Sequence, residues 1–320
     1  MQNLQVFSQG NPDFSIMFYN VENLFDTIDD KSKDDNEFLP QSEKKWNTYR
    51  FYAKIKNISR VIAAAGEWHN PDIIGMCEIE NSQCLWSLTH STALSKFQYN
   101  SIHFDSRDSR GIDVGILYNP QTFKPSIKRR IPIYFPKDSL ATTRDILYVK
   151  GTILKSLDTI HVFVCHFPSR RGGERKSEPK RIFVASVLKS KVDSINAAQK
   201  NAQIVIIGDF NDDPSNTSIK KTLGATVEPA NCANCLTNVV DAEALGTHYY
   251  KGIWSTLDQT IISNTWFANY KVENTVVSHD FLFTQSKKSG DKSPYRTYAA
   301  TRYIGGYSDH LPVIVKFYKK

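Results

Sequence analysis

Short apolar runs rich in β-branched residues recur along the chain, and each is bounded by polar or turn-forming residues. Runs of this length and composition predict β-strands. The segment 145–154 is followed closely by 159–166, an arrangement typical of a hairpin, so we expect mixed sheets rather than a regular parallel β–α–β succession. The predicted strands are Phe14–Tyr19, Asp72–Met76, Val114–Tyr118, Ile146–Leu154, Ile160–Val164, Ile204–Ile207, Leu257–Ile262, His279–Phe283 and Val313–Phe317.

Helical spacing of apolar residues occurs in two segments between the predicted strands. In the first, apolar side chains from Phe51 to Ile62 share one face of a helix that ends near Gly66. The second covers Ile182 to Ile195 in the same way, and Pro179 fits its first turn, where a missing N–H is tolerated.

Composition is typical of a soluble folded protein that is large enough to bury a sizeable core, with 320 residues, 40% of them hydrophobic and 23% charged. No run approaches the roughly 18 apolar residues of a membrane helix, and residues 1–10 lack the pattern of a signal peptide. The polar stretches 26–47 and 224–252 predict long surface loops. We expect one monomeric domain over residues 1–320, with a flexible start at 1–12 and no membrane span.

The net charge of +7 favours a polyanionic partner, because Lys and Arg displace counterions from phosphate chains. This signal is modest, since many basic proteins never meet nucleic acid. The pair Cys232 and Cys235 lacks a second pair of ligands, so free thiols or a local disulfide are favoured over zinc. The acidic cluster within 29–35 lacks the spacing of a calcium loop and predicts a solvated loop.

Polar residues repeatedly stand where a predicted strand ends, which is the rim of a sheet. Such residues are Asn20, Glu22, Glu78, Glu80, His166, Asp209 and Asn211. Because side chains alternate along a strand, we expect Glu78 and Glu80 to share one face, and likewise Asp209 and Asn211. Taken singly, an Asp or Asn after a strand commonly starts a turn, and a histidine there is commonly structural.

Together these residue types suit a hard cation and a proton-transfer group. Mg²⁺ prefers a few oxygen ligands plus water, and Glu78 could supply one of them. Asp309 and His310 stand immediately before the last strand, and histidine transfers protons near neutral pH. Its orienting carboxylate is expected to be Asp258, although Asp280 in Ser-His-Asp is a rival.

These segments resemble the endonuclease/exonuclease/phosphatase superfamily, the deoxyribonuclease-like metal-dependent phosphoesterases. The resemblance rests on Tyr-Asn-Val-Glu-Asn at 19–23, Pro-Asp-Ile-Ile-Gly-Met-Cys-Glu at 71–78, Gly-Asp-Phe-Asn-Asp at 208–212 and Ser-Asp-His at 308–310. It spans nearly the whole chain, and the motifs are specific as a set. It implies an α/β (α+β) fold, a four-layer α/β/β/α sandwich with two mixed β-sheets and a site at one rim.

The resemblance also implies roles for individual residues. Glu78 resembles the principal metal ligand, with Asn20 and Asp309 assisting, and the expected ion is Mg²⁺, with Mn²⁺ or Ca²⁺ as alternatives. Asp209 and Asn211 resemble the pair that orients the attacking water. His310 with Asp258 resembles a pair described either as base or as phosphate stabiliser, and both roles stay open. Gln259 departs from the His or Tyr that more usually follows this aspartate.

His166 resembles the histidine that the deoxyribonuclease branch places near the leaving oxygen, where abasic-site repair enzymes carry a tyrosine. Arg144, Ser169, Arg170 and Arg171 are expected to bind substrate phosphate, although a solvated basic loop is an equal alternative. The Ser-Arg-Arg-Gly-Gly run at 169–173 and Gly-Gly-Tyr-Ser-Asp-His at 305–310 are similar to an uncharacterised bacterial branch, which leaves the substrate open.

We therefore expect a divalent-metal-dependent phosphodiesterase, foremost a nuclease that acts on DNA or RNA by metal-assisted water attack. The alternative is a phosphomonoesterase, or an esterase of inositol phosphates or lipid headgroups, on the same scaffold. A catalytically inactive phosphate-binding module is less favoured, because every expected polar position is present.

Overall fold

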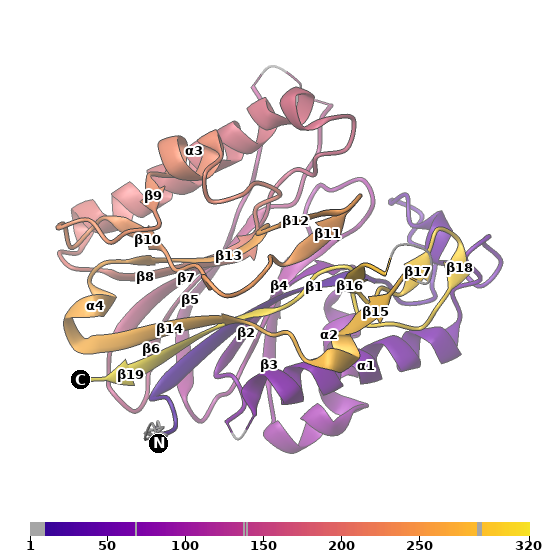
Figure 1. Cartoon of the computed structure of the whole chain (residues 1–320), viewed down its shortest axis with the longest axis horizontal. Coiled ribbons are helices and arrows are strands. Elements are labelled where there is room, and N and C mark those ends of the chain that lie inside the picture. The colour runs from indigo at the N-terminus through magenta and orange to yellow at the C-terminus, as the bar shows by residue number, and fades with distance from the viewer. Residues whose placement is uncertain (1–9, 68, 137, 139, 287–289) are drawn as a thin grey trace.

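The computed structural model describes residues 10–67, 69–136, 138, 140–286 and 290–320, so the expected flexible start falls mostly outside the described residues. Two large sheets, of six and seven strands, form the centre (Figure 1). The six-stranded sheet has the order β14 (Tyr270–Val276), β19 (Val313–Lys319), β1 (Phe14–Leu24), β2 (Ile73–Ile79), β4 (Asp113–Tyr118), β3 (Asn100–His103). The seven-stranded sheet has the order β5 (Phe123–Ile131), β6 (Ile146–Ile153), β7 (Thr159–His166), β8 (Gln203–Asp209), β13 (Asp258–Ser263), β10 (Leu236–Asn238), β9 (Ala225–Thr226).

The two sheets pack face to face over one continuous apolar core. Val164 and Ile207 project from the seven-stranded sheet toward β2, where residue 75 is a glycine. A Cβ atom at Gly75 would lie 2.5 Å from the Ile207 side chain, so only glycine permits the sheets to approach this closely.

Helices cover the two outer faces, which completes four layers (Figure 1). The helices α1 (Thr48–Gly66) and α2 (Ser82–His90) pack against the six-stranded sheet, and α3 (Glu174–Ala198) packs against the seven-stranded sheet through a second apolar cluster. Asn47 caps α1 by accepting a hydrogen bond from Arg50 N. The predicted α/β sandwich with two mixed sheets is thus confirmed, and none of the described helices is long and apolar enough to cross a membrane.

Smaller elements decorate this frame. They are the 3-10 helices η1 (Asn36–Phe38), η2 (Ala93–Phe97) and η4 (Asp280–Leu282), the π-helical η3 (Ser218–Leu223), the helix α4 (Trp266–Asn269), and the strand pairs β11 (His248–Tyr250) with β12 (Ile253–Ser255), β15 (Phe283–Gln285) with β16 (Lys292–Pro294), and β17 (Tyr298–Ala299) with β18 (Arg302–Tyr303).

Three local predictions are wrong. Residues 280–282 form a 3-10 helix rather than a strand, and only Phe283 onward pairs with another strand. The helix α3 starts at Glu174, so Pro179 lies beyond its first turn. The stretch 224–252 is not all loop: it contributes β9 and β10 to one end of the seven-stranded sheet, where Asn238 Nδ2 donates a hydrogen bond to Gln259 Oε1.

The topology brings distant segments to one rim. β1 and β2 run parallel to each other, and so do β7 and β8, so each pair presents its carboxyl ends on the same side. β13 and β19 run antiparallel to these neighbours and therefore begin at that rim. Chain segments more than 200 residues apart in sequence, such as Asn20 and His310, thus meet there.

Candidate active site at the rim of the two sheets

Asp209, the last residue of β8, lies at the centre of the site. Its Oδ2 accepts a hydrogen bond from Asn20 Nδ2 at 3.0 Å. The same oxygen lies 3.6 Å from His166 Nε2 and 3.9 Å from His310 Nε2. Sheet register explains this convergence, because both His166 and Asp258 pair directly with Asp209 across neighbouring strands.

Asp258, rather than Asp280, lies beside His310. The Nδ1 atom of His310 is 2.7 Å from Asp258 Oδ2, and both side chains are buried. The backbone N–H of Asp258 donates to Thr247 Oγ1 at 3.0 Å, which fixes the start of β13. The rival Asp280 is exposed and pairs with Lys292. We call His166, Asp209, Asp258 and His310 the histidine side of the site.

Glu78 reaches the site because the backbone of β2 is irregular there. The register of β2 shifts between Cys77 and Ile79, and Glu78 has a φ of 63°. Its Oε2 accepts from Asn23 N at 2.9 Å, and its Oε1 lies 4.0 Å from His166 Nε2. The prediction that Glu78 and Glu80 share a face is wrong, because this bulge breaks the alternation and Glu80 instead accepts from Asp26 N at 2.6 Å.

Left-handed backbone recurs at the rim. Besides Glu78, the residues Glu22, Asn23 and Asn211 have φ values of 52°, 55° and 50°. Non-glycine residues in this region cost of order 1–3 kcal/mol each and gather at functional sites. Asn211 therefore reaches the site through a turn, not through strand alternation: its N–H donates to Asp209 Oδ1 at 2.9 Å and its Nδ2 to Phe167 O at 3.1 Å.

Carboxylates and two basic side chains form the other half of the site, and burial lowers the pKa of Lys54 to about 8. Arg296 contacts Glu22 Oε1 at 3.2 Å and Asp309 Oδ2 at 3.0 Å. Lys54 Nζ lies 3.9 Å from Glu22 Oε2 and is fully buried. We call Glu22, Glu78, Asp309, Arg296 and Lys54 the carboxylate side. Its two cations were missed in the sequence, although Lys54 falls on the apolar face of its helix, which was a readable signal.

His248 is a further neighbour that the sequence did not reveal, since it lies within the polar stretch 224–252. Its ring packs on that of His310 with centroids 4.6 Å apart, and the two backbones form an antiparallel bridge. The hairpin of β11 and β12 therefore rises directly beside the catalytic candidates, with Tyr250 and Ile253 exposed.

Burial and neighbouring charge separate the protonation states of the histidine side. Burial raises the pKa of Asp209 to about 7; the His310 charge opposes this rise and Asp258 adds to it. Burial alone would lower the pKa of His310, but the carboxylates of Asp258 and Asp209 outweigh it and hold that pKa well above its usual value. Burial and then the Arg144 charge lower the pKa of His166 well below its usual value. One histidine is thus charged and the other neutral.

The donor set at this rim fits a divalent cation. The carboxylates crowd one another: burial and then the charge of Asp309 raise the pKa of Glu22 to about 7. Buried Asp258 Oδ1 and His166 Nδ1 have no hydrogen-bond partner among the described residues. Ligand atoms of Asp209, Asp258 and His310 lie within 4.8 Å of one another, as do those of His248, Asp309 and His310. Asn20 Oδ1 is less available as a metal ligand, because it already accepts a hydrogen bond from Glu22 N at 3.0 Å.

A cleft of about 730 Å³ continues from the rim. Asn23 and Pro168 connect it to the site, and the predicted phosphate-binding residues Arg144, Ser169 and Arg171 line it. Further cations at its walls are Lys44, Arg110, Lys176 and Lys180. Arg144 is buried and engaged with Asp108 at 3.3 Å and Phe167 O at 2.7 Å, so it stiffens the wall.

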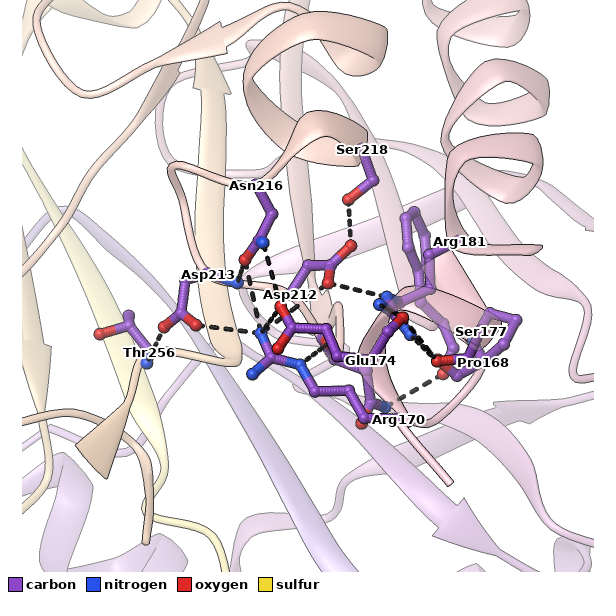
Figure 2. A network of polar contacts seen from close by, with 12 residues as sticks. Pro168, Arg170, Glu174, Ser177, Arg181, Asp212, Asp213, Asn216, Ser218 and Thr256 are labelled. Carbon is purple, nitrogen blue, oxygen red and sulfur yellow. Dashed lines mark hydrogen bonds and ion pairs between the residues drawn. The ribbon is translucent and has the colours of Figure 1, made fainter. Parts of the chain in front are cut away.

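Arg170 does not line this cleft but belongs to an internal network (Figure 2). Its Nε donates to Asn211 O at 2.8 Å and its Nη2 to Asp213 Oδ2 at 3.0 Å. Asp213 Oδ1 in turn accepts from Thr256 N at 2.8 Å, two residues before Asp258. Behind it, buried Arg181 contacts Asp212 at 2.8 Å. The network therefore braces the turn of Asn211 and the start of β13.

Known structures share this fold. The chain superposes on a TDP2 structure from Caenorhabditis elegans with a TM-score of 0.59 at 14% identity, covering 95% of this chain and 74% of that one. It superposes on the human Nocturnin catalytic domain with bound sulfate with a TM-score of 0.58 at 16% identity, covering 96% of this chain and 94% of that one. A mannosyl-6-phosphatase from Bacteroides thetaiotaomicron superposes with a TM-score of 0.60 at 14% identity, covering 95% of this chain and 99% of that one. At these identities the likeness concerns the fold alone.

Sequence comparison goes further than the structural likeness. No curated protein sequence matches the chain significantly. A model of the endonuclease/exonuclease/phosphatase family, however, matches residues 15–319, which include every motif at the rim. The chain therefore belongs to the endonuclease/exonuclease/phosphatase family.

Proposed function

We propose that this protein is a divalent-metal-dependent phosphodiesterase that hydrolyses nucleic acid. The observation that carries the proposal is the convergence of Asp209, the His310–Asp258 pair, His166 and Glu78 at one rim, within hydrogen-bonding or ion-pairing reach of their neighbours. Carboxylates and imidazoles gathered this closely are costly for folding and are typical of a catalytic site.

The carboxylate side suits the cation. Glu78 and Asp309 would supply oxygen ligands, with Asn20 assisting through its amide or a water. Arg296 contacts both Glu22 and Asp309, and Lys54 lies near Glu22, so these two basic side chains balance part of the carboxylate charge. When bound, a divalent ion neutralises charge that develops on the phosphoryl and leaving oxygens. Mg²⁺ suits such an oxygen-rich set, and Mn²⁺ or Ca²⁺ are alternatives.

The histidine side suits the proton and the phosphate. Asp209 and Asn211 would orient the water, and the backbone N–H of Asn211 donates to Asp209 Oδ1, which ties the two residues together at the end of β8. Asp258 holds Nδ1 of His310, so the Nε2 atom is directed toward Asp209 and toward a phosphoryl oxygen placed between them. His166, between Glu78 and Asp209, is placed to serve the leaving oxygen.

The cationic cleft favours a polymeric diester over a small monoester. Its lining holds six basic residues, Lys44, Arg110, Arg144, Arg171, Lys176 and Lys180, against three acidic ones, Asp34, Glu37 and Asp108, so the cleft carries a net positive charge. Lys and Arg arranged along a cleft bind a phosphate backbone. A phosphomonoesterase is the second candidate, because a structure with the same fold is named a mannosyl-6-phosphatase.

A substrate panel tests the proposal. Single-stranded DNA, duplex DNA, RNA, mannose 6-phosphate, inositol phosphates and sphingomyelin would each be incubated with Mg²⁺, Mn²⁺, Ca²⁺ or chelator. Cleavage of a nucleic acid that requires metal and falls at least tenfold in Glu78→Gln at limiting Mg²⁺ and in His310→Gln supports it, with exposed Lys220→Gln as the control. Turnover of monoesters alone would establish the second candidate, and phosphate binding without turnover would indicate an inactive module.

A further inference from the structure

A second pocket opens on the outer face of the seven-stranded sheet, away from the rim. The helix α3 packs on this sheet through residues such as Leu188 and Val192 and leaves part of the outer face of β5 and β6 open. The pocket between them has a volume of about 480 Å³, within the range of small-molecule sites. It is lined by Arg129, Arg130, Ile131, Pro132, Tyr148, Lys150, His161, Phe163, Lys191, Ser194, Ile195, Ala198 and Gln199. We call it the outer pocket.

Positive charge in the outer pocket is unbalanced. Arg129, Arg130, Lys150 and Lys191 line it, and none of its lining residues is acidic. Arg130 contacts Asp145 at 3.4 Å. Within the described part of the chain, the side chains of the other cations have no ion pair or hydrogen bond. Like charges that converge on one cavity repel one another, and an anion bound among them would relieve the repulsion.

The floor of the outer pocket is apolar and is held in place by partly buried hydrogen bonds. Ile131, Phe163 and Ile195 supply apolar surface. Tyr148 Oη lies 2.8 Å from His161 Nδ1, and His161 Nε2 lies 3.1 Å from Gln199 Oε1, so strand and helix are tied across the cavity. A wall ordered in advance lowers the entropic cost of binding a ligand.

The outer pocket is independent of the active site. None of its lining residues belongs to the histidine side or the carboxylate side. His161 precedes His166 by five positions on β7, which places the two roughly 16 Å apart along the strand. A ligand in the outer pocket would therefore not occupy the catalytic rim.

We propose that the outer pocket binds a mononucleotide-sized anion, a flat ring that carries one phosphate. The ring lies on Ile131, Phe163 and Ile195 beside Tyr148, and the phosphate contacts Lys150, Lys191 and Arg129. Apolar floor and cationic wall thus each recognise one part of the ligand. The volume of about 480 Å³ is sufficient for a molecule of this size.

Calorimetry with the full chain tests this, with chelator present to prevent turnover. We expect adenosine monophosphate to bind at least tenfold more tightly than adenosine, which lacks the charge, or inorganic phosphate, which lacks the ring. Replacing both Lys150→Gln and Lys191→Gln should weaken binding roughly tenfold to a hundredfold, because each removes a charge-assisted hydrogen bond. Lys124→Gln, on the neighbouring strand β5 but outside the lining, and Glu78→Gln at the rim should leave it unchanged.

Several outcomes would overturn the proposal. These are no binding at millimolar nucleotide, equal affinity in the double variant whose fold circular dichroism shows to be intact, or a loss of binding in Glu78→Gln, which would move the ligand to the rim. Binding of single-stranded DNA that depends on Lys150 and Lys191, without binding of the mononucleotide, would assign the pocket to a strand instead.

Discussion

The two sides of the candidate active site balance their buried carboxylates in different ways. On the histidine side, the acids Asp209 and Asp258 are balanced by an imidazole that can gain or lose a proton. On the carboxylate side, Glu22 and Asp309 are balanced by Arg296 and Lys54. The first arrangement presents an imidazole that can move a proton, whereas the second presents carboxylate oxygens whose charge a divalent cation would balance.

The residues of the two sides come largely from different sheets. His166, Asp209 and Asp258 come from the seven-stranded sheet, while Glu22 and Glu78 come from the six-stranded sheet. His310 precedes β19 of the six-stranded sheet yet pairs with Asp258 of the other. The alignment of this pair therefore depends on close packing between the sheets, which Gly75 permits.

Asp209 should be the least replaceable residue on the histidine side. Asp209→Ala removes the group that contacts Asn20, His166 and His310 together, so we expect kcat to fall by roughly 10⁴-fold or more. Folding should survive, because burial of this carboxylate is unfavourable by itself. Single-turnover kinetics and a thermal melt measure the two effects. Substantial remaining activity would remove Asp209 from the mechanism.

The His310–Asp258 pair should behave as one unit. Each of His310→Gln and Asp258→Asn is expected to lower kcat by roughly 10²- to 10⁴-fold, because proton transfer or phosphate contact needs the oriented imidazole. The double variant should lose little more than the worse single variant. Effects that multiply in the double variant would show that the two residues act separately.

Glu78 is instead expected to act by binding the cation, which distinguishes it from the residues of the histidine side. Glu78→Gln is expected to raise the Mg²⁺ concentration needed for half-maximal activity by roughly tenfold to a hundredfold, since one anionic ligand is lost. Glu80→Gln is the matched control, because Glu80 directly follows the same strand but accepts a hydrogen bond from Asp26 N. A metal titration of activity measures both, and an equal shift in the two variants would contradict the assignment.

The sequence predicted the histidine side better than the carboxylate side. Asp209, His166 and Asp258 are strand-end residues, and strand ends can be read from apolar runs. Glu78 was found by its motif, but the bulge that aims it was not visible, because a positive φ at a glutamate results from tertiary packing. The fold class followed from the motifs, whereas the strands β9 and β10 did not, since β9 has only two residues and β10 carries the buried polar residues Thr237 and Asn238.

Lys54, Arg296 and His248 were missed for a related reason. Arg296 lies in a segment without periodic pattern, and only the fold brings it to Glu22 and Asp309, which are distant or separated by turns in sequence.

The adjacent residues Arg170 and Arg171 were given one role because sequence cannot tell which way each side chain points. The structure separates them: Arg170 lies in the network of Figure 2, and Arg171 lines the cleft.

The smallest predicted effect tests whether this network supports the histidine side from behind. Arg170→Lys keeps the charge but cannot reach both Asn211 O and Asp213, so Asn211 and the start of β13 lose their brace. We expect kcat to fall about tenfold with KM unchanged. Arg171→Lys should leave kcat unchanged, and Arg171→Ala should raise KM a few-fold with a weaker salt dependence, because one phosphate contact is lost.

Steady-state kinetics of the two arginine variants at several salt concentrations separates these effects. A purely structural role of Arg170 would lower the melting temperature and leave the kcat of the folded fraction intact. A direct phosphate contact by Arg170 would raise KM instead, as at Arg171. A fall in kcat without a change in KM, absent from the Arg171 variants, is the result expected of a residue that acts through Asn211 and Asp258. It would show that residues without substrate contact position the histidine side.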